Sequence, residues 1–166
     1  MILTNTKEEE KMIQFLRVDH RLLHGQVAVS WFNALDVNTI LVANDGVAAD
    51  DFRKSAIRLA KPEAAKLVMK SIDESIEAIN SGVTNKYNML IVVESVEDAY
   101  KLIHGTNGKI PMLNLGGTKQ REGTANFSKA INLTPEEVAK LKELQKEKVD
   151  VFMQQVPNEK KVTFEA

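Results

Sequence analysis

The side chains best suited to chemistry are concentrated in one short polar segment, RVDHRLLHGQV, at residues 17–27. It holds two arginines, an aspartate and two histidines within eight residues, and we expect it to join a strand to a helix. Loops of this kind carry binding and catalytic groups more often than the elements they connect. A side chain that binds or reacts with an anion is therefore expected here.

His24 and Arg21 in this segment suggest chemistry on a phosphoryl group. The imidazole of His24 is substantially neutral near pH 7 and can act as a nucleophile. The helix that we expect from Gly25 points its free N–H groups back at the loop, which favours an anion there. Arg21 can offer a planar fork of donors to phosphate oxygens. Phosphoryl transfer depends on such positioning and charge neutralisation, and the site is expected to form without a metal.

The same residues have other interpretations. A polar strand–helix turn, in which a histidine caps backbone groups, is equally consistent with the composition of the segment. His20 and His24 have the spacing of a zinc pair on a helix. They precede the helix, however, and Arg21 would repel a cation, so no metal site is expected. His104, just before Gly105 at the end of a helix, is expected to face solvent and interact with the helix dipole.

Two more polar turns follow expected strands. Asp45, in the sequence ANDG, could orient an active-site group or simply form a turn. Asn114 is followed by Gly116 and Gly117, which permit close approach of a ligand or only a tight turn. Ligands of α/β sheets bind beyond the carboxyl ends of the strands. These residues are therefore candidates for a cleft beside the 17–27 segment.

The fold class follows from short apolar strands that alternate with amphipathic helices. Strands are expected at residues 12–18, 39–43, 66–69, 89–93, 110–115, 129–133, 149–155 and, as an edge strand, 161–164. This order predicts an α/β fold, with an open, mainly parallel central sheet, helices on both faces and short edge strands at the C-terminus. Residues 118–128 are expected to be irregular.

One helix is expected at residues 25–35. Four more are expected to begin after the capping residues Asp50, Ser71, Ser95 and Thr134. Helical spacing then predicts which side chains of the first two helices face the core. These are Val27, Trp31, Ala34, Leu35, Phe52, Ala56 and Leu59.

The composition excludes several classes of protein. The chain has 166 residues, which fits one domain. It has 22 Lys plus Arg and 23 Asp plus Glu, so it lacks the excess of positive charge that is typical of nucleic-acid-binding proteins. It has no cysteine, so disulfides and thiolate sites are excluded. No apolar run approaches the ~18 residues of a membrane span, and no secretory signal or cofactor motif is expected. Residues 1–11 are expected to be a disordered or frayed extension of a single domain at 12–166.

The 17–27 segment resembles the opening of the IIB components of the mannose/fructose/sorbose family of sugar phosphotransferase systems. Those proteins share an R-[IV]-D-x-R-L-[IL]-H-G-Q-V pattern after their first strand. The resemblance continues through VANDGVA near residue 45, NLGG near residue 115 and QQVP at 154–157, and it covers about residues 12–164. His20 stands at a variable position of the pattern, so the resemblance assigns it no role.

The resemblance implies a function and a set of partners. His24 would accept a phosphoryl group from a IIA domain and pass it to a sugar brought in by membrane IIC and IID subunits. Arg21 would stabilise charge, in a cytoplasmic protein that associates peripherally with the transporter. The residues that would support the loop and the phosphate are Asp19, Gly25, Gln26 and Arg17.

Two rival functions share some of these features. A non-catalytic α/β module could bind an anionic metabolite in the same cleft, but it would not need a nucleophilic histidine there. A receiver-like signalling domain using Asp45 is disfavoured, because its first strand should end in an acidic pair that holds magnesium. The sequence does not determine the sugar, among mannose, fructose, sorbose and N-acetylgalactosamine, or the oligomeric state, and a homo-oligomer is compatible with it.

Overall fold

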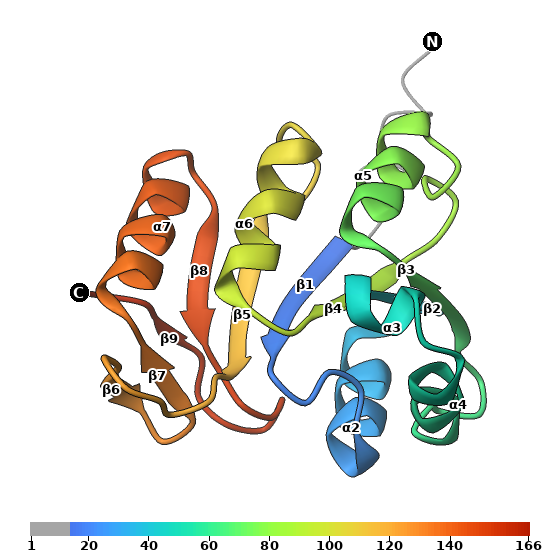
Figure 1. Ribbon diagram of the computed structural model, residues 1–166, viewed down its shortest axis with the longest axis horizontal. Coiled ribbons are helices and arrows are strands. Elements are labelled where there is room, and N and C mark those ends of the chain that lie inside the picture. Colours follow the sequence, from blue (N-terminus) through green and yellow to red (C-terminus); the bar gives the residue numbers. More distant parts are fainter. Residues whose placement is uncertain (1–13) are drawn as a thin grey trace, which may run out of the picture.

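The computed structural model describes residues 14–166, so the expected extension at 1–11 and the first residues of the expected first strand lie outside the described part (Figure 1). Its main sheet has seven strands in the order β3-β2-β4-β1-β5-β8-β9. All neighbouring strands are parallel except β8 and β9. The bounds of these strands are β1 (Gln14–Asp19), β2 (Thr39–Ala43), β3 (Lys66–Lys70), β4 (Met89–Val93), β5 (Met112–Gly117), β8 (Asp150–Met153) and β9 (Val162–Thr163).

Helices cover both faces of this sheet, which confirms the predicted α/β fold. One face packs against α2 (Gly25–Leu35), α3 (Asp45–Ala48) and α4 (Asp51–Leu59). The other face packs against α5 (Ile72–Ser81), α6 (Val96–Gly105) and α7 (Pro135–Lys146), which run in front of the sheet in Figure 1. In residues 14–166, no helix is both long enough and apolar enough to cross a bilayer.

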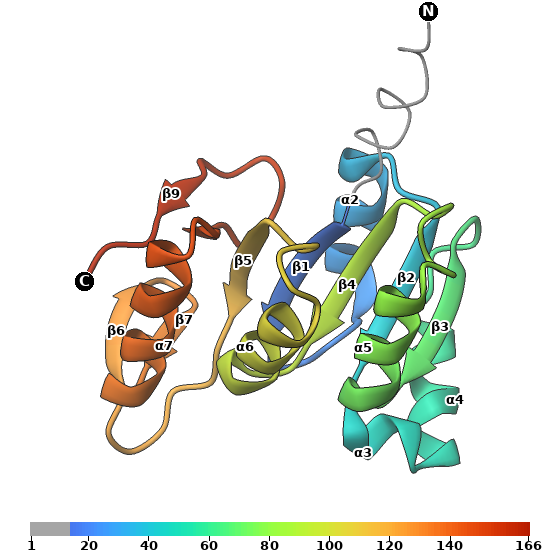
Figure 2. The ribbon, with the colours of Figure 1, turned by 90° about the horizontal axis from the view of Figure 1, so that it is seen from above.

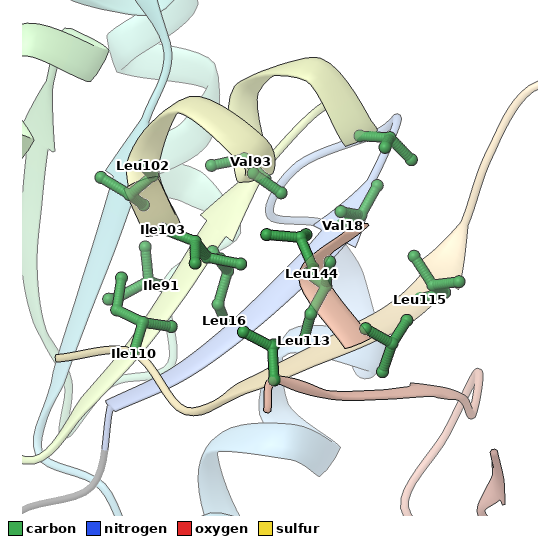
Figure 3. Packing of buried hydrophobic residues seen from close by; sticks show 14 of the residues in the cluster. Leu16, Val18, Ile91, Val93, Leu102, Ile103, Ile110, Leu113, Leu115 and Leu144 are labelled. Carbon is green, nitrogen blue, oxygen red and sulfur yellow. The ribbon is translucent and has the colours of Figure 1, made fainter. Parts of the chain in front are cut away.

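The alternation of side chains along the central strands gives each face its own core. Leu16 and Val18 of β1 pack with Ile91 of β4 and Leu102 of α6 on one face (Figure 3). Phe15 of β1 packs on the opposite face, in the cluster that also contains residues of α2. Strands buried on both faces are characteristic of parallel sheets between helical layers.

The position of β1 in the sheet creates the place for a site. β1 leads to α2 on one face, whereas its neighbour β4 leads to α6 on the other. Connections that diverge in this way leave a crevice outside the carboxyl ends of the strands, where α/β proteins bind ligands. Figure 1 shows the loops that follow β1, β5 and β8 at this same edge.

Local capping signals agree with the structure. Ser71 with Glu74 begins α5, and Thr134 with Glu137 begins α7, each pair forming a reciprocal capping box. Gly82 ends α5 with φ +86°, a left-handed conformation that glycine adopts at little cost.

The predicted buried face of α4 was wrong. Phe52 is 84% exposed, Leu59 is 91% exposed, and Ala56 is also exposed, whereas Ile57 is buried. A helix of nine residues has too few turns for its sequence to show which apolar side chains face the sheet. Ile57 is the buried residue of α4, and its packing in the core cluster on this face of the sheet determines which side of the helix faces the strands.

The predicted face of α2 was partly wrong. Trp31 is buried as expected, but Ala34 is exposed and Val27 and Leu35 are only half-buried. Ala28 and Phe32 are buried instead, so the helix is rotated relative to the expectation. Almost every residue of α2 outside its first turn is apolar or small, which is why the pattern did not define one face.

The segment after β5 is more regular than expected. β6 (Ala125–Ser128) pairs antiparallel with β7 (Ile131–Leu133), and this hairpin lies beside α7 (Figures 1 and 2). The expected irregular region therefore ends in a strand, and the strand expected at 129–133 begins later. α3 was also not predicted, because its start, ANDG, reads as a turn. Asn44 caps it by accepting a hydrogen bond from the backbone N of Val47.

Candidate phosphoryl-transfer site

The loop after β1 is anchored by two buried leucines. The backbone N of Leu22 donates to the carbonyl of Asp19 at 2.8 Å, which closes a tight turn. Leu22 has φ +58°, a conformation that is strained for a bulky residue, and its side chain is buried with that of Leu23. Strain of this kind persists where the surrounding structure over-determines it, as at functional sites. The anchoring holds the next residue, His24, at the start of α2.

The N-terminus of α2 is open. His24 occupies the N-cap position with extended backbone, and no side chain caps the helix. Gly25 has φ +44°, and a Cβ at this residue would have no neighbour within 4 Å, so its conformation rather than crowding favours glycine. The first turn contains no acidic side chain. The free N–H groups and the helix dipole can therefore attract an anion beside His24.

Asp19, at the end of β1, connects the groups of the site. Its carboxylate is fully buried, and its Oδ2 lies 2.9 Å from Nε2 of His24 and 3.1 Å from Nη2 of Arg17. Oδ1 accepts from the backbone N of Arg21 at 3.0 Å and lies 3.7 Å from Nε of the same arginine. One buried carboxylate therefore positions the histidine, the loop and two guanidinium groups.

Arg17 links Asp19 to the neighbouring strands. Its guanidinium is buried and donates through Nη1 to Oδ1 of Asn114 at 2.7 Å and to the carbonyl of Gln154 at 3.3 Å. The group also lies 5.3 Å from the ring centroid of Trp31, where a cation is stabilised by the aromatic face. Burial without these partners would be costly for a charge.

Gly116 provides the space that Arg17 occupies. A Cβ at this residue would lie 2.1 Å from Cζ of Arg17. The pairing of β1 with β5 also shifts here, because Val18 pairs with Leu115 and Asp19 pairs with Gly117. Bulges of this kind re-aim side chains beside active sites.

The electrostatic environment keeps Asp19 ionised. Burial alone raises the pKa of its carboxyl, but the hydrogen bonds from His24 and from the backbone of Arg21, with the charge of Arg17, lower the pKa overall. Burial lowers the pKa of the Arg17 guanidinium, and the charge of Asp19 opposes that effect. Asp19 and Arg17 thus form a charged pair beneath the imidazole of His24.

The Asp19 contact distinguishes the two ring nitrogens of His24. An ionised carboxylate accepts, so Nε2 carries the hydrogen and donates to Asp19. The neutral ring then has its lone pair on Nδ1, for which no hydrogen-bond partner is found among residues 14–166. The side chain of His24 is 24% exposed. Nδ1 is therefore the nitrogen available to act as a nucleophile.

The structure brings together most of the predicted site residues. His24, Arg21, Asp19 and Arg17 form the network described above, and Asn114 and Gly116 support it from β5. Gly25 and Gln26 begin α2 and are exposed, so both backbones are open to a ligand. Gly117 belongs to the same edge, where its carbonyl accepts from the backbone N of His20 at 3.0 Å.

Asp45 lies outside this network. Its Oδ1 accepts from the backbone N of Ile72 at 2.9 Å, so the carboxylate interacts with the N-terminus of α5. Within residues 14–166, Asp45 has no hydrogen bond to His24. Asp45 is the first residue of α3, and its carboxylate connects α3 to the start of α5 rather than to the loop after β1.

Gln154 and Trp31 belong to the site and were not predicted to. The carbonyl of Gln154 accepts from Arg17 and from Nδ2 of Asn114 at 3.0 Å. Nε1 of Trp31 donates to the carbonyl of Gln155 at 3.0 Å. The only signal in the sequence was the QQVP segment, which carried a resemblance but no chemistry, since backbone carbonyls leave no trace in residue type.

Groups that could ligate a metal lie elsewhere in the described residues. His104 of α6 and Glu143 and Glu147 near the end of α7 offer atoms within 4.8 Å of one another. Nε2 of His104 lies 2.7 Å from a carboxylate oxygen of Glu147. His104 is thus partly exposed, as expected, and its ring contacts Glu147 at the end of the neighbouring helix.

The chain matches the model of one protein family over almost its whole length. The model described as the sorbose subfamily IIB component of the phosphotransferase system matches residues 13–166. The chain belongs to this family. It is thus a IIB component of the mannose/sorbose-type phosphotransferase systems, and IIB components are phosphotransferases.

Relatives of known name match over most of the chain. A "Probable phosphotransferase enzyme IIB component" from Streptococcus pyogenes serotype M6 is 32% identical, over 91% of this chain and 96% of the relative. The sorbose-specific EIIB component of Klebsiella pneumoniae is 26% identical, over 92% of each chain. The mannose-specific EIIAB component of Escherichia coli K12 is 26% identical, and the match spans 46% of that longer protein.

Solved structures have the same fold as this IIB chain. The crystal structure of the IIB domain of the sorbose permease from Klebsiella pneumoniae superposes with a TM-score of 0.84 at 26% identity. The match covers 91% of this chain and 92% of that one. The central parallel sheet and its helical layers are therefore the common architecture of these domains.

Proposed function

We propose that this IIB chain is a phosphocarrier in which Nδ1 of His24 accepts a phosphoryl group from a IIA domain and passes it to a sugar. The observation that carries the proposal is the 2.9 Å contact between Nε2 of His24 and the buried carboxylate of Asp19. It holds the ring in one orientation and one tautomer, with the lone pair on Nδ1. Function as a nucleophile requires this arrangement.

The chemistry of the carrier has two steps. In the first, a bond forms between Nδ1 and phosphorus as the bond from phosphorus to the donor breaks, and the ring becomes an imidazolium that still donates through Nε2. Asp19 stabilises that positive charge, as a carboxylate does behind the histidine of a catalytic triad. In the second, the oxygen of a sugar hydroxyl bonds to phosphorus while the Nδ1–P bond breaks, the bonding electrons return to Nδ1 as its lone pair, and the hydroxyl proton passes to solvent.

The groups around Nδ1 are suited to a phosphoryl group in transit. The side chain of Arg21 is half exposed, so its guanidinium can turn toward the phosphoryl oxygens while its backbone N stays bound to Asp19. The free N–H groups at the start of α2 supply further donors. Such preorganised donors stabilise charge in a transferring group.

The names of the relatives support the partners. The mannose-specific EIIAB component joins a IIA part and a IIB part in one protein, which supports a IIA domain as the donor. We propose that the sugar is presented by membrane IIC and IID subunits, with this chain acting on the cytoplasmic side and associating peripherally with them. The relatives are named for sorbose, mannose and N-acetylgalactosamine, so the sugar is expected to be of this class.

The experiment that tests the proposal maps the phosphoryl group. Wild type, His24→Ala and the control His20→Ala are phosphorylated by a IIA partner, and the label is located by mass spectrometry under alkaline conditions. We expect an acid-labile, alkali-stable label on His24 that His20→Ala retains and His24→Ala loses. Folding of each variant is checked by circular dichroism.

Three results would contradict the proposal. Label in folded His24→Ala would exclude His24 as the acceptor, and an acid-stable label would exclude a phosphohistidine. Binding of phosphate without any labelling by an active IIA donor would favour a non-catalytic anion-binding module instead.

A further inference from the structure

The solvent face of α4 is apolar, which is unusual for a surface helix. Among residues 14–166, Phe52 and Leu59 are the two most exposed large hydrophobic side chains. They are seven residues apart, so they lie on one face of α4, two turns from each other, with the exposed Ala56 between them. Amphipathic helices bury such a face. Figures 1 and 2 both show α4 at the β3 end of the molecule.

Opposite charges flank this apolar face. Asp51 and Arg58 are also seven residues apart and therefore share one flank of α4. Neither has an ion-pair partner within the described part of the chain. Arg58 lines a groove of about 450 Å³ between α4 and the edge strand β3, with Lys54 and Lys61 and no carboxylate. Asp51 and Arg58 thus stand on one flank of α4 but two turns apart, so neither neutralises the other within one copy of the chain.

We infer that the exposed face of α4 binds α4 of a second copy of this chain, antiparallel and across a two-fold axis. In this arrangement Phe52 of each copy lies against Leu59 of the other. Ser55 and Ala56 meet at the axis, where their small side chains let the helices approach closely. Asp51 of each copy then lies opposite Arg58 of the other, which gives two symmetric ion pairs.

Two-fold symmetry accounts for the pattern of residues. An isologous contact requires a surface that is complementary to itself. The acidic residue stands at one end of the face and the basic residue at the other, so an antiparallel pair matches them, whereas a parallel pair would place like charges together. The helix dipoles are also antiparallel in this pairing.

The edge strand β3 is not suited to make the contact. An antiparallel pairing of β3 with its copy about a two-fold axis at its centre would place Lys66 opposite Lys70. Like charges directly opposite each other destabilise a strand pair, and lysines on an edge commonly prevent such pairing. The helix therefore mediates the contact that the adjacent edge strand opposes.

An anionic bilayer fits the face less well than a second copy does. Asp50 and Asp51 stand at the end of α4 next to Phe52 and would be repelled by anionic lipid head groups. In the antiparallel pair, by contrast, Asp51 meets Arg58. Lys54 and Lys61 line the groove on the β3 side of α4 and not its apolar face, so the residues that flank Phe52 and Leu59 do not form the uniformly basic surface that an anionic bilayer would favour.

The size of the face indicates a weak dimer. A nine-residue helix is about 14 Å long, and its exposed face buries less than the roughly 800 Å² per partner of a standard interface. Dimers should therefore form at high concentration and dissociate on dilution. Phe52 and Leu59 have no hydrogen bond or shared core cluster with Asp19 or His24 in the described residues, so the inference does not rest on the proposed function.

Sedimentation equilibrium of the full chain, from about 10 µM to about 1 mM, tests the apolar part of the contact. We expect wild type to shift from monomer to dimer over this range and Phe52→Ser/Leu59→Ser to remain monomeric. The control is Val83→Ser/Val162→Ser, which removes the two other exposed large hydrophobic residues, at 58% and 46% exposure. It should dimerise like wild type.

Charge-reversal variants test the geometry. Asp51→Arg and Arg58→Asp should each be monomeric, because each homodimer would place like charges opposite one another twice. An equimolar mixture should form a heterodimer, since both contacts then pair opposite charges. Circular dichroism and labelling of His24 by a IIA donor should match wild type for all these variants, which separates lost association from lost folding or lost phosphotransfer.

Three results would overturn the inference. These are a wild type that stays monomeric at about 1 mM, a Phe52→Ser/Leu59→Ser variant that dimerises like wild type, and charge variants that do not associate when mixed. Vesicles of phosphatidylglycerol test the alternative that the face binds an anionic membrane surface. Binding of monomeric wild type to them, lost in Phe52→Ser/Leu59→Ser, would assign the face to a membrane surface instead.

Discussion

Asp19 determines the chemistry of His24 at the scale of single residues. Its buried carboxylate selects the tautomer of the imidazole and is itself kept ionised by Arg17 and by the backbone N–H of Arg21. A histidine at the start of a helix without such a partner would be free to rotate and to exchange tautomers. In the proposed mechanism, the contact with Asp19, five positions earlier, is therefore what distinguishes His24 from a histidine that only caps a helix.

Arg21 is the side chain whose loss should affect transfer without affecting the fold. In Arg21→Ala the backbone N–H to Asp19 remains, so stability should change by no more than about 0.5 kcal/mol. The rate of phosphotransfer should fall by roughly 10²–10³-fold, because a donor to the transferring group is removed. Arg21→Lys should restore the rate only in part, since an ammonium lacks the planar fork. Rapid-quench kinetics with a IIA donor measure this, and near-normal rates in Arg21→Ala would exclude Arg21 from the mechanism.

The two glycines at the end of β5 should differ in their tolerance of a methyl group. In Gly116→Ala the new Cβ would lie 2.1 Å from Arg17, which must then leave its buried position, and we expect a loss of about 1–3 kcal/mol in the free energy of unfolding. Gly117→Ala is the matched control, because its nearest contact would be Oδ1 of Asp19 at 3.5 Å. Urea unfolding of both variants measures the difference. Equal stability of the two would show that Arg17 is not held as described.

At the scale of elements, α6 and α7 are joined by polar contacts on their exposed surfaces. Tyr100 of α6 donates to Glu143 of α7 at 2.6 Å, one turn from the contact of His104 with Glu147. The buried contacts of the same helices lie below, where Leu102 and Leu144 pack on the sheet (Figure 3). The polar contacts therefore align two helices that are already held by their apolar faces.

The pKa of Tyr100 depends on its hydrogen bond to Glu143, so titration of the tyrosines tests the contact between α6 and α7. The hydrogen bond to Glu143 raises the pKa of Tyr100 to about 12, whereas the hydrogen bond from Lys66 lowers the pKa of Tyr87. The chain has only these two tyrosines, so absorbance at alkaline pH should rise in two separate steps. Glu143→Gln should bring the later step to lower pH and leave the earlier one unchanged. A single step in folded wild type would contradict the contacts.

At the scale of the whole molecule, the site is assembled by the sheet. β1, β5 and β8 lie side by side, and Arg17 of β1 contacts Asn114 of β5 and Gln154, the residue that follows β8. Arg17, Asp19 and Asn114 are buried within the fold, whereas the imidazole of His24 and the side chain of Arg21 reach solvent. Stability of the sheet and geometry of the site are thus coupled through Arg17 and Asp19.

The dependence of stability on pH should reveal this coupling. The pKa of Asp19 is lower in the folded chain than its unfolded value of about 3.9, so its stabilising effect is present above that value and is lost as the pH falls through the folded pKa. At pH 7, Asp19→Asn should be about 3–5 kcal/mol less stable, because Arg17 is left buried without its counter-ion. This difference should shrink as the pH falls below about 4. Urea unfolding between pH 7 and pH 3 measures it, and a difference independent of pH would contradict the ion pair.

The sequence by itself determined most of the elements and grouped the residues proposed here to react. Strand–helix alternation predicted the sheet and its two helical layers, and the capping boxes at Ser71 and Thr134 located two helix starts. The 17–27 segment placed His24, Arg21 and Asp19 in one loop. These features are local, because they depend on residues a few positions apart whose types limit backbone conformation and hydrogen bonding.

Only the tertiary structure decided which distant groups complete the site and which faces are buried. Arg17 meets Asn114 across 97 positions and the carbonyl of Gln154 across 137, and no local pattern encodes such contacts. The orientation of α4 is likewise set by the contact of Ile57 with the sheet, which leaves Phe52 and Leu59 in solvent. Helical spacing shows which residues share a face, but packing against the strands determines which face is covered.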